Sequence, residues 1–255
     1  MSTAGQVAEV RGWLRPIAHR GLHESRRGIV ENTGAAFAGA IAAGYGIECD
    51  IRPAADGVPV VFHDPTTGRL CDVDRPVDAL TAHELAALGH RDGGGAILRL
   101  GDLLDLVGGR VPVLVEIKSD WRPLPDAFLR EAGGLLSSYR GPVAAMSFDP
   151  EPLIDLRHRA PDVPRGLVSA NLAAHAATVA KIGIERARRL THLMESRRVA
   201  PQLIAYDVRA LPDPVVGYVR EVVGLPVLAW TIRTAAELAV ASDTADAPIF
   251  EGILR

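Results

Sequence analysis

Apolar and polar positions along the chain follow a repeating alternation. Short runs rich in β-branched residues are each followed by a loop and then by a longer segment rich in alanine and leucine. This alternation of strand-length and helix-length segments is typical of parallel strands covered by helices. Strands are expected at residues 15–19, 46–51, 111–117, 142–147, 164–169, 202–206, 226–231 and 247–254. Eight such units predict an α/β fold, a (β/α)₈ TIM barrel, with residues 1–255 as a single domain.

One segment interrupts the alternation. The second strand leads through Asp56-Gly57 directly into the apolar run 58–62. An Asp-Gly pair between apolar runs predicts a hairpin. A parallel neighbour would need a crossover of about a dozen residues, and too few are available. We therefore expect residues 58–62 to run antiparallel above the barrel mouth and to return His63 to it.

The stretch after His63 is the least regular part of the chain. Residues 64–99 are rich in Asp, Gly and Arg, and we expect them to form a small insertion after the second strand that caps the mouth. Thr81 and Glu84 have the spacing of a capping box, which predicts one short helix at 82–88. Similar signals predict other helix ends: Asn32 or Thr33 with Gly44, Thr234 with Glu237, and Asp149 with Pro150.

Composition limits the classes of protein to consider. The 255 residues are 48% hydrophobic and 23% charged, an ordinary globular balance, and the net charge of −3 gives no global basic field for nucleic acid. No apolar stretch reaches the roughly 18 residues of a transmembrane segment, and residues 1–15 lack the pattern of a secretory signal. No feature indicates an oligomeric state.

Two local features bear on location. Cys49 and Cys71 are the only cysteines, and we expect both to be free thiols in a reducing cytosol, so a cytoplasmic location is predicted. Residues 183–199 carry five arginines. They are consistent with a membrane-surface helix, but a barrel helix with a solvated basic face is the favoured interpretation.

Three acidic residues lie near the ends of predicted strands. Glu48 and Asp50 are two residues apart, so their side chains share a face, and Glu116 ends the third predicted strand. Acids facing a barrel interior are unfavourable unless they are paired, hydrated or bound to a cation. A salt bridge explains one such acid, whereas three favour one divalent cation. Hard oxygen donors without clustered Cys or His favour Mg²⁺ or Ca²⁺ over zinc. Cys49 should point away into the packing.

Histidines and cations stand beside these acids. His19 and His63 fit a general acid and base pair for phosphodiester cleavage, although a lone histidine beside a strand is more often structural. Arg20 and Lys118 suit a phosphate clamp. Neutralising Glu116 is an equally supported role for Lys118. Trp230 can offer an apolar wall to a glycerol moiety or can simply fill the core.

The residues of these motifs and their order along the chain resemble the glycerophosphodiester phosphodiesterase family. The resemblance spans almost the whole chain and rests on Ile17-Ala18-His19-Arg20-Gly21, Glu31-Asn32-Thr33, Glu48-Cys49-Asp50, Phe62-His63-Asp64, Val115-Glu116-Ile117-Lys118, Met146-Ser147-Phe148-Asp149-Pro150 and Ala229-Trp230-Thr231. It implies a TIM barrel and metal-dependent hydrolysis of a small-molecule glycerophosphodiester to glycerol 3-phosphate and an alcohol. It also implies metal binding at Glu48, Asp50 and Glu116, and catalysis by His19 and His63.

Arg233 departs from the family pattern, which usually has Asn there, and suggests an extra negative charge on the substrate. Two other hypotheses remain open. A lipid-directed phosphodiesterase that leaves a cyclic phosphate would show an apolar patch around the mouth, and the sequence shows none clearly. A non-catalytic phosphoester-binding barrel would lack a histidine or a carboxylate, and all are present. Hydrolysis is therefore the leading hypothesis.

Overall fold

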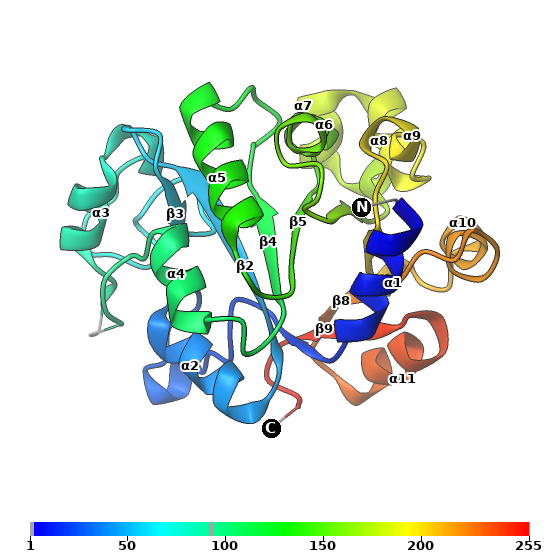
Figure 1. The fold of residues 1–255 in the computed structure, drawn as a ribbon, viewed down its shortest axis with the longest axis horizontal. Helices are drawn as coiled ribbons and strands as arrows, with labels where there is room; N and C mark the ends of the chain where they lie inside the picture. The colour runs from blue at the N-terminus through cyan, green and yellow to red at the C-terminus, as the bar shows by residue number, and fades with distance from the viewer. Residues whose placement is uncertain (1–2, 92–93, 255) are drawn as a thin grey trace.

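The computed structural model describes residues 3–91 and 94–254 and shows parallel strands closed into a barrel with helices around it (Figure 1). The barrel strands are β1 (Ile17–Ala18), β2 (Gly46–Pro53), β4 (Val113–Ile117), β5 (Val143–Ser147), β6 (Arg165–Ser169), β7 (Leu203–Asp207), β8 (Val227–Ile232) and β9 (Ala247–Phe250). Neighbouring strands pair in this order, and β1 pairs with both β2 and β9, which closes the barrel. The predicted (β/α)₈ fold is confirmed. Residues 1, 2, 92, 93 and 255 of the predicted domain lie outside the described part.

The first and last strands are shorter than expected. β1 spans two residues where 15–19 was predicted, and β9 ends at Phe250 where the pattern ran to residue 254. The chain turns after β9 because Gly252 adopts a positive φ of 76°, in the left-handed region that suits glycine. That turn leaves Glu251 at the barrel mouth, where its side chain reaches His19.

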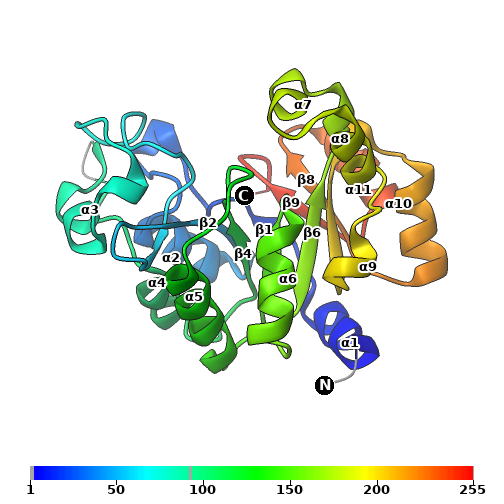
Figure 2. The same cartoon turned by 90° about the horizontal axis from the view of Figure 1, so that it is seen from above.

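Helices follow most of the strands and lie outside the barrel (Figures 1 and 2). They are α1 (Thr3–Trp13), α2 (Gly34–Ala43), α3 (Ala82–Leu88), α4 (Leu100–Val107), α5 (Asp126–Ser138), α6 (Pro150–Arg159), α7 (Ala176–Ile182), α8 (Ile184–Thr191), α9 (Ser196–Val199), α10 (Pro214–Tyr218) and α11 (Ala235–Thr244). The predicted caps form: Thr33 caps α2, Asp149 caps α6, and Thr81 and Thr234 make capping boxes.

The predicted antiparallel excursion is confirmed. β3 (Pro59–Val61) pairs antiparallel with β2, with Ile51 opposite Val61. Gly57 turns the chain between the two strands with a φ of 80°. A Cβ at this position would lie 2.8 Å from Ala127 Cβ, so the turn needs glycine for space as well as for conformation. The excursion then delivers His63 directly after β3.

Alternation along the strands separates two cores. One face of each strand packs against the surrounding helices in the main apolar cluster, which contains Cys49. The other face fills the barrel interior with residues such as Leu114 and Leu228. Val10 and Trp13 of α1 join this interior cluster, so α1 covers the end of the barrel opposite the strands' carboxyl ends (Figure 2). Cys49 therefore points away from its acidic neighbours, as expected.

The segment 64–99 forms a small apolar cluster together with Ala54, Val60 and Phe62 of the β2–β3 hairpin region. Cys71, Val77, Leu85 and Ile97 pack on Phe62 in a cluster separate from the two barrel cores. The helix expected at 82–88 forms as α3. Residues 92 and 93 of this segment lie outside the described part of the chain.

The arginine-rich stretch 183–199 forms two helices, α8 and α9, and several of its arginines pair with acids. Arg198 contacts Glu151 and Glu195, and Arg189 also contacts Glu195. This pattern supports the solvated basic face over the membrane-surface helix. In the described part of the chain, no helix is both long and apolar enough to cross a membrane.

Candidate active site

Three buried carboxylates meet where β2 and β4 run side by side. Glu48 and Asp50 are two residues apart on β2, so both side chains lie on its interior face. The register places Asp50 beside Glu116 on β4. One oxygen from each side chain can be chosen so that all three lie within 4.8 Å of one another. The three residues are at most 7% exposed. The predicted ligand set is therefore assembled by adjacent parallel strands.

Ionisation of Glu48 is disfavoured within this cluster. Burial raises the pKa of Glu48 well above its ordinary value, and the charges of Asp50 and Glu116 raise it further. Glu48 Oε1 is buried, with no hydrogen-bond partner in the described residues. Buried acceptors of this kind are normally satisfied. Three hard oxygen donors, one with an unused atom, fit a divalent cation such as Mg²⁺ or Ca²⁺.

Two cations partly compensate these acids. Lys118 Nζ lies 2.9 Å from Asp50 Oδ1 and also pairs with Glu116. Arg20 Nε lies 3.2 Å from Asp50 Oδ2. Burial opposes ionisation of Asp50, but Lys118 and Arg20 outweigh it, and the pKa of Asp50 is lowered. Lys118 thus neutralises acids, as one of its two predicted roles requires, while its side chain also lines the cavity described below.

A buried amide completes the surroundings of Asp50. Asn32 Nδ2 donates to Asp50 Oδ2 at 2.9 Å, and the backbone N–H of Asp50 donates to Asn32 Oδ1 at 3.3 Å. Asn32 adopts a positive φ of 57°, a conformation that Asn tolerates better than most residues. Its neighbour Glu31 accepts from Arg20 at 2.7 Å. The Glu31-Asn32-Thr33 motif thus positions Arg20, which follows β1, and the Asp50 carboxylate, and Thr33 caps α2.

His19 stands between two acids. Its Nδ1 lies 3.2 Å from Glu251 Oε2, and its Nε2 lies 3.9 Å from Glu48 Oε2. The hydrogen bond from His19 and the contact with Arg233 lower the pKa of Glu251 to about 2, so this carboxylate is ionised and can only accept. Nδ1 of His19 must then carry the proton, so Nε2, on the side of Glu48, is the nitrogen with a free lone pair. Burial lowers the pKa of His19 itself.

His63 has an equivalent arrangement. Its Nδ1 lies 2.7 Å from Asp64 Oδ1, and Asp64 Oδ2 accepts from Arg69 Nε at 2.5 Å. Arg69 also donates to Glu31. Burial lowers the pKa of His63. Both histidines are therefore held at Nδ1 by an acid.

The predicted site residues share one opening. A cavity of about 280 Å³ is lined by His19, Arg20, Glu48, His63, Glu116, Lys118, Trp230 and Arg233. Asp50 joins them through its contacts with Arg20 and Lys118. All nine residues singled out from the sequence are thus brought together. Arg233 donates to Glu251 at 2.7 Å, so the structure places its charge beside the carboxylate that holds His19.

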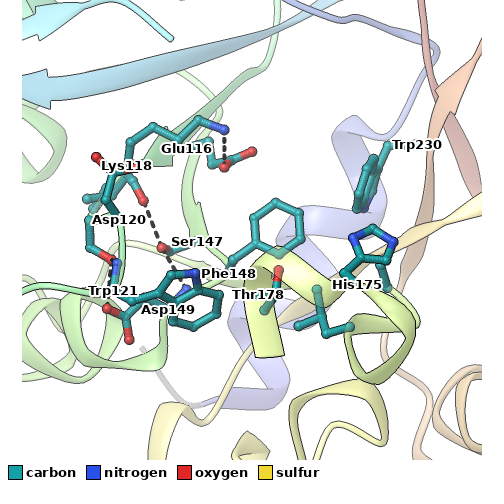
Figure 3. A pocket seen from close by; sticks show the side chains of 14 residues that line it. Glu116, Lys118, Asp120, Trp121, Ser147, Phe148, Asp149, His175, Thr178 and Trp230 are labelled. Carbon is teal, nitrogen blue, oxygen red and sulfur yellow. Dashed lines mark hydrogen bonds and ion pairs between the residues drawn. The ribbon is translucent and has the colours of Figure 1, made fainter. Parts of the chain in front are cut away.

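A second cavity continues from the first. It has a volume of about 230 Å³, shares Glu116, Lys118, Phe148 and Trp230 with the first, and extends past Trp121 (Figure 3). The rings of Phe148 and Trp230 meet edge to face with centroids 5.4 Å apart. Trp230 therefore lines both spaces, compatible with the apolar-wall role predicted for it.

Sequence reasoning missed several supporting residues. Asp64, Asn32 and Glu31 lie inside the quoted motifs, which was the available signal, although only Asp64 is adjacent in sequence to the residue it contacts. Glu251 was missed entirely because its contact with His19 joins positions 232 residues apart. The available signal was its place just beyond the last barrel strand, next to β1.

The fold and the site together define a TIM-barrel protein. Its opening combines three carboxylates that can bind a cation with two histidines that are each hydrogen-bonded to a carboxylate. Residues 19–247 match the glycerophosphoryl diester phosphodiesterase family, and the chain belongs to this family. Glycerophosphodiester phosphodiesterase 1 from Bos taurus is 43% identical over 79 residues, which are 28% of this chain. The match spans 23% of that protein's length.

Solved structures resemble almost the whole chain. A putative glycerophosphoryl diester phosphodiesterase from Silicibacter pomeroyi is 25% identical, with a TM-score of 0.72 and coverage of 96% of this chain and 93% of that one. An Oleispira antarctica phosphodiesterase, solved with the product sn-glycerol-3-phosphate, is 22% identical with a TM-score of 0.74, covering 95% and 94% of the two chains. The latter likeness supports the fold.

Proposed function

We propose that this chain hydrolyses glycerophosphodiesters to glycerol 3-phosphate and an alcohol, with one divalent cation held by Glu48, Asp50 and Glu116. The observation that carries the proposal is the buried carboxylate cluster, in which Glu48 Oε1 has no hydrogen-bond partner among the described residues, in one cavity with two histidines held at Nδ1. A bound Mg²⁺ or Ca²⁺ would supply positive charge to the phosphoryl oxygens. The product bound by the Oleispira antarctica relative is the same phosphoester class.

The two histidines supply the proton transfers. Each has an ionised carboxylate partner that fixes its tautomer, so its Nε2 is available in the cavity. One histidine accepts the proton of the attacking water, and the other, when protonated, delivers a proton to the leaving alkoxide. Asp64 and Glu251 orient the two rings and stabilise their protonated forms.

The remaining residues bind and orient the substrate. Arg20 and Lys118 contact the phosphoryl oxygens of the bound substrate. Those oxygens compete with the carboxylates that the two cations contact now. Trp230 packs against the glycerol moiety, and Arg233 contacts the variable part. Residues 64–99 cap the opening and shape the leaving-group site. Residues Pro65, Thr66 and Val77 of that segment support this role, because they line a cavity of about 600 Å³ that also reaches Lys118. A cytosolic location stays a prediction.

Phosphorus NMR tests the proposal directly. The protein is incubated with Mg²⁺ or Ca²⁺ and a panel of glycerophosphodiesters, with a chelator-treated sample as control. We expect glycerol 3-phosphate to form only in the metal-loaded sample. A cyclic phosphate product would favour the lipid-directed alternative. Binding without turnover across the panel would favour the non-catalytic barrel.

A further inference from the structure

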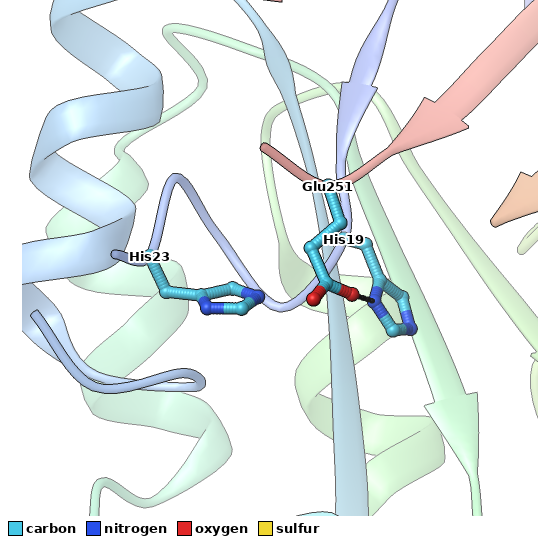
Figure 4. Close-up of side chains that lie close together, drawn as sticks. All are labelled: His19, His23 and Glu251. Carbon is cyan, nitrogen blue, oxygen red and sulfur yellow. Dashed lines mark hydrogen bonds and ion pairs between the residues drawn. The ribbon is translucent and has the colours of Figure 1, made fainter. Parts of the chain in front are cut away.

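A second group of metal-ligating side chains lies beside the carboxylate cluster and shares none of its acids. It consists of His19 after β1, His23 four residues later, and Glu251 after β9. One donor atom from each lies within 4.8 Å of the others. Figure 4 shows the ring of His23 directed toward the hydrogen-bonded pair of Glu251 and His19.

Coordination would use a ring nitrogen of His23 and would replace the hydrogen bond between His19 and Glu251. His23 Nε2 is buried and has no hydrogen-bond partner among the residues that the structure describes. Burial lowers the pKa of His23, so its ring is neutral and offers a lone pair near neutral pH. His19 Nδ1 and Glu251 Oε2 are 3.2 Å apart. That separation matches the roughly 3.3 Å between two ligands of a tetrahedral Zn²⁺ with bonds of about 2.0–2.1 Å.

The group is open to solvent on one side. His23 and Glu251 line a surface cavity of about 470 Å³, which provides a path from solvent. Arg233 donates to Glu251 and opposes a bound cation, but its side chain is 54% exposed and can swing into solvent. Arg20 also lies nearby and is paired with Glu31 and Asp50, and Arg26 lines the same surface cavity.

We propose that His19, His23 and Glu251 bind an ion of the zinc class, and that this binding inhibits the enzyme. Two imidazoles and one carboxylate form a donor set that Zn²⁺ uses in proteins, with a fourth position left for water. Imidazole favours Zn²⁺, Ni²⁺ and Cu²⁺, whereas the all-oxygen cluster favours Mg²⁺ and Ca²⁺. The two sites therefore select different ions.

Inhibition follows from the nitrogen that would be coordinated. A metal on Nδ1 of His19 displaces the proton that Nδ1 shares with Glu251, and the neutral ring then carries its proton on Nε2. Nε2 is the atom that lies 3.9 Å from Glu48 and serves the cavity. When Nε2 carries the ring's one proton, it has no free lone pair and can no longer accept a proton from water. This consequence rests on the proposed catalytic role of His19, whereas the binding does not.

The binding is tested with Co²⁺ as a spectroscopic substitute for Zn²⁺. Tag-free protein in excess Mg²⁺ is titrated with Co²⁺ for the visible absorption of a low-coordinate imidazole-bound ion, and Zn²⁺ is then added to displace it. The variants are His23→Gln and, as a matched control, His83→Gln, whose side chain is exposed on α3. We expect the His23 variant to weaken Co²⁺ binding by about 10–100-fold or more. Unchanged binding in a folded His23→Gln protein would refute the site.

Inhibition is measured separately. Each protein's rate is followed against Zn²⁺ and expressed relative to its own zinc-free rate, at two Mg²⁺ concentrations. We expect His23→Gln to need about 10–100-fold more Zn²⁺ for half-inhibition, while His83→Gln behaves as wild type. Equal inhibition of all three, relieved by Mg²⁺, would place the inhibitory Zn²⁺ on the carboxylates and overturn this part of the proposal. If the protein lacks phosphodiesterase activity, the Co²⁺ titration still decides whether the site exists.

Discussion

His19 and His63 show how a contact at one ring nitrogen determines the chemistry available at the other. Each Nδ1 lies against an acid, Glu251 or Asp64, at 3.2 and 2.7 Å. An ionised carboxylate accepts only, so the free lone pair is at Nε2. The sequence identified both histidines by their position at strand ends, but it identified neither acid as a partner. For Glu251 no local pattern could do so, because the two residues meet only when the barrel closes.

The histidines themselves give the first prediction. His19→Ala and His63→Ala should each lower kcat by about 10²–10⁴-fold, since each removes a positioned proton donor or acceptor. Steady-state kinetics with a saturating cation measures this effect. His83→Ala on the exposed side of α3 is the control and should keep normal turnover. Near-normal kcat in either active-site variant would show that its role is misassigned.

Arg233 gives a second prediction, sharpened by its contact with Glu251. If the guanidinium also contacts a negative group on the substrate, Arg233→Ala should reduce kcat/KM more for acidic glycerophosphodiesters than for neutral ones. A charge-assisted hydrogen bond contributes about 1.5–3 kcal/mol, enough for tenfold or greater discrimination. An equal loss for both classes would show that Arg233 acts only through Glu251 and His19.

At the scale of helices and strands, turn and capping motifs in the sequence predicted the structure well. The Asp-Gly turn correctly predicted that β3 runs antiparallel to β2, and the capping boxes correctly predicted the starts of α3 and α11. In contrast, α1 was not predicted. It contains Gly5 and Gly12 and lacks a clear apolar face, and its Val10 and Trp13 gain their burial from the barrel interior. Tertiary packing, not local propensity, explains that helix.

The segment 64–99 supports a prediction at this scale, because the apolar cluster that it forms with the β2–β3 hairpin region is separate from the two barrel cores. Leu85 is fully buried in that small cluster, so Leu85→Ala should cost about 2–5 kcal/mol of local stability. Hydrogen exchange should become faster in residues 64–91, while β4 to β8 keep their protection. KM should shift more than kcat if the segment shapes the substrate opening.

The control for that experiment is His83→Ala on the same helix, where the side chain is exposed. It should leave both exchange and KM unchanged. Loss of protection throughout the barrel strands in Leu85→Ala would contradict the interpretation of 64–99 as a cap whose apolar cluster is separate from the barrel cores. It would show instead that this segment and the barrel unfold together.

For the whole molecule, the buried carboxylates link stability to both pH and metal. The pKa of Glu48 is raised, so the folded protein binds this proton more tightly than the unfolded chain does. Between the ordinary pKa of 4.5 and the raised value, the free energy of unfolding therefore falls as pH rises. Without a cation, the contribution of Glu48 to the free energy of unfolding is complete only below pH 4.5, the lower end of this range. A cation that replaces the proton should restore stability at higher pH.

The resulting prediction is measured by thermal unfolding at pH 5 and pH 8. Mg²⁺ or Ca²⁺ should raise Tm more at pH 8, and a cation at about 100 times its Kd adds about 2.7 kcal/mol. Glu48→Gln should raise the Tm of the metal-free protein at pH 8, because a neutral amide avoids the stability that Glu48 loses as it ionises beside Asp50 and Glu116. It should also abolish most of the metal-dependent increase. Asp105→Asn, which removes an exposed carboxylate on α4, should keep the increase. If the cation stabilised Glu48→Gln as much as the wild type, the ion would bind elsewhere, and the three carboxylates would need another explanation for their burial together.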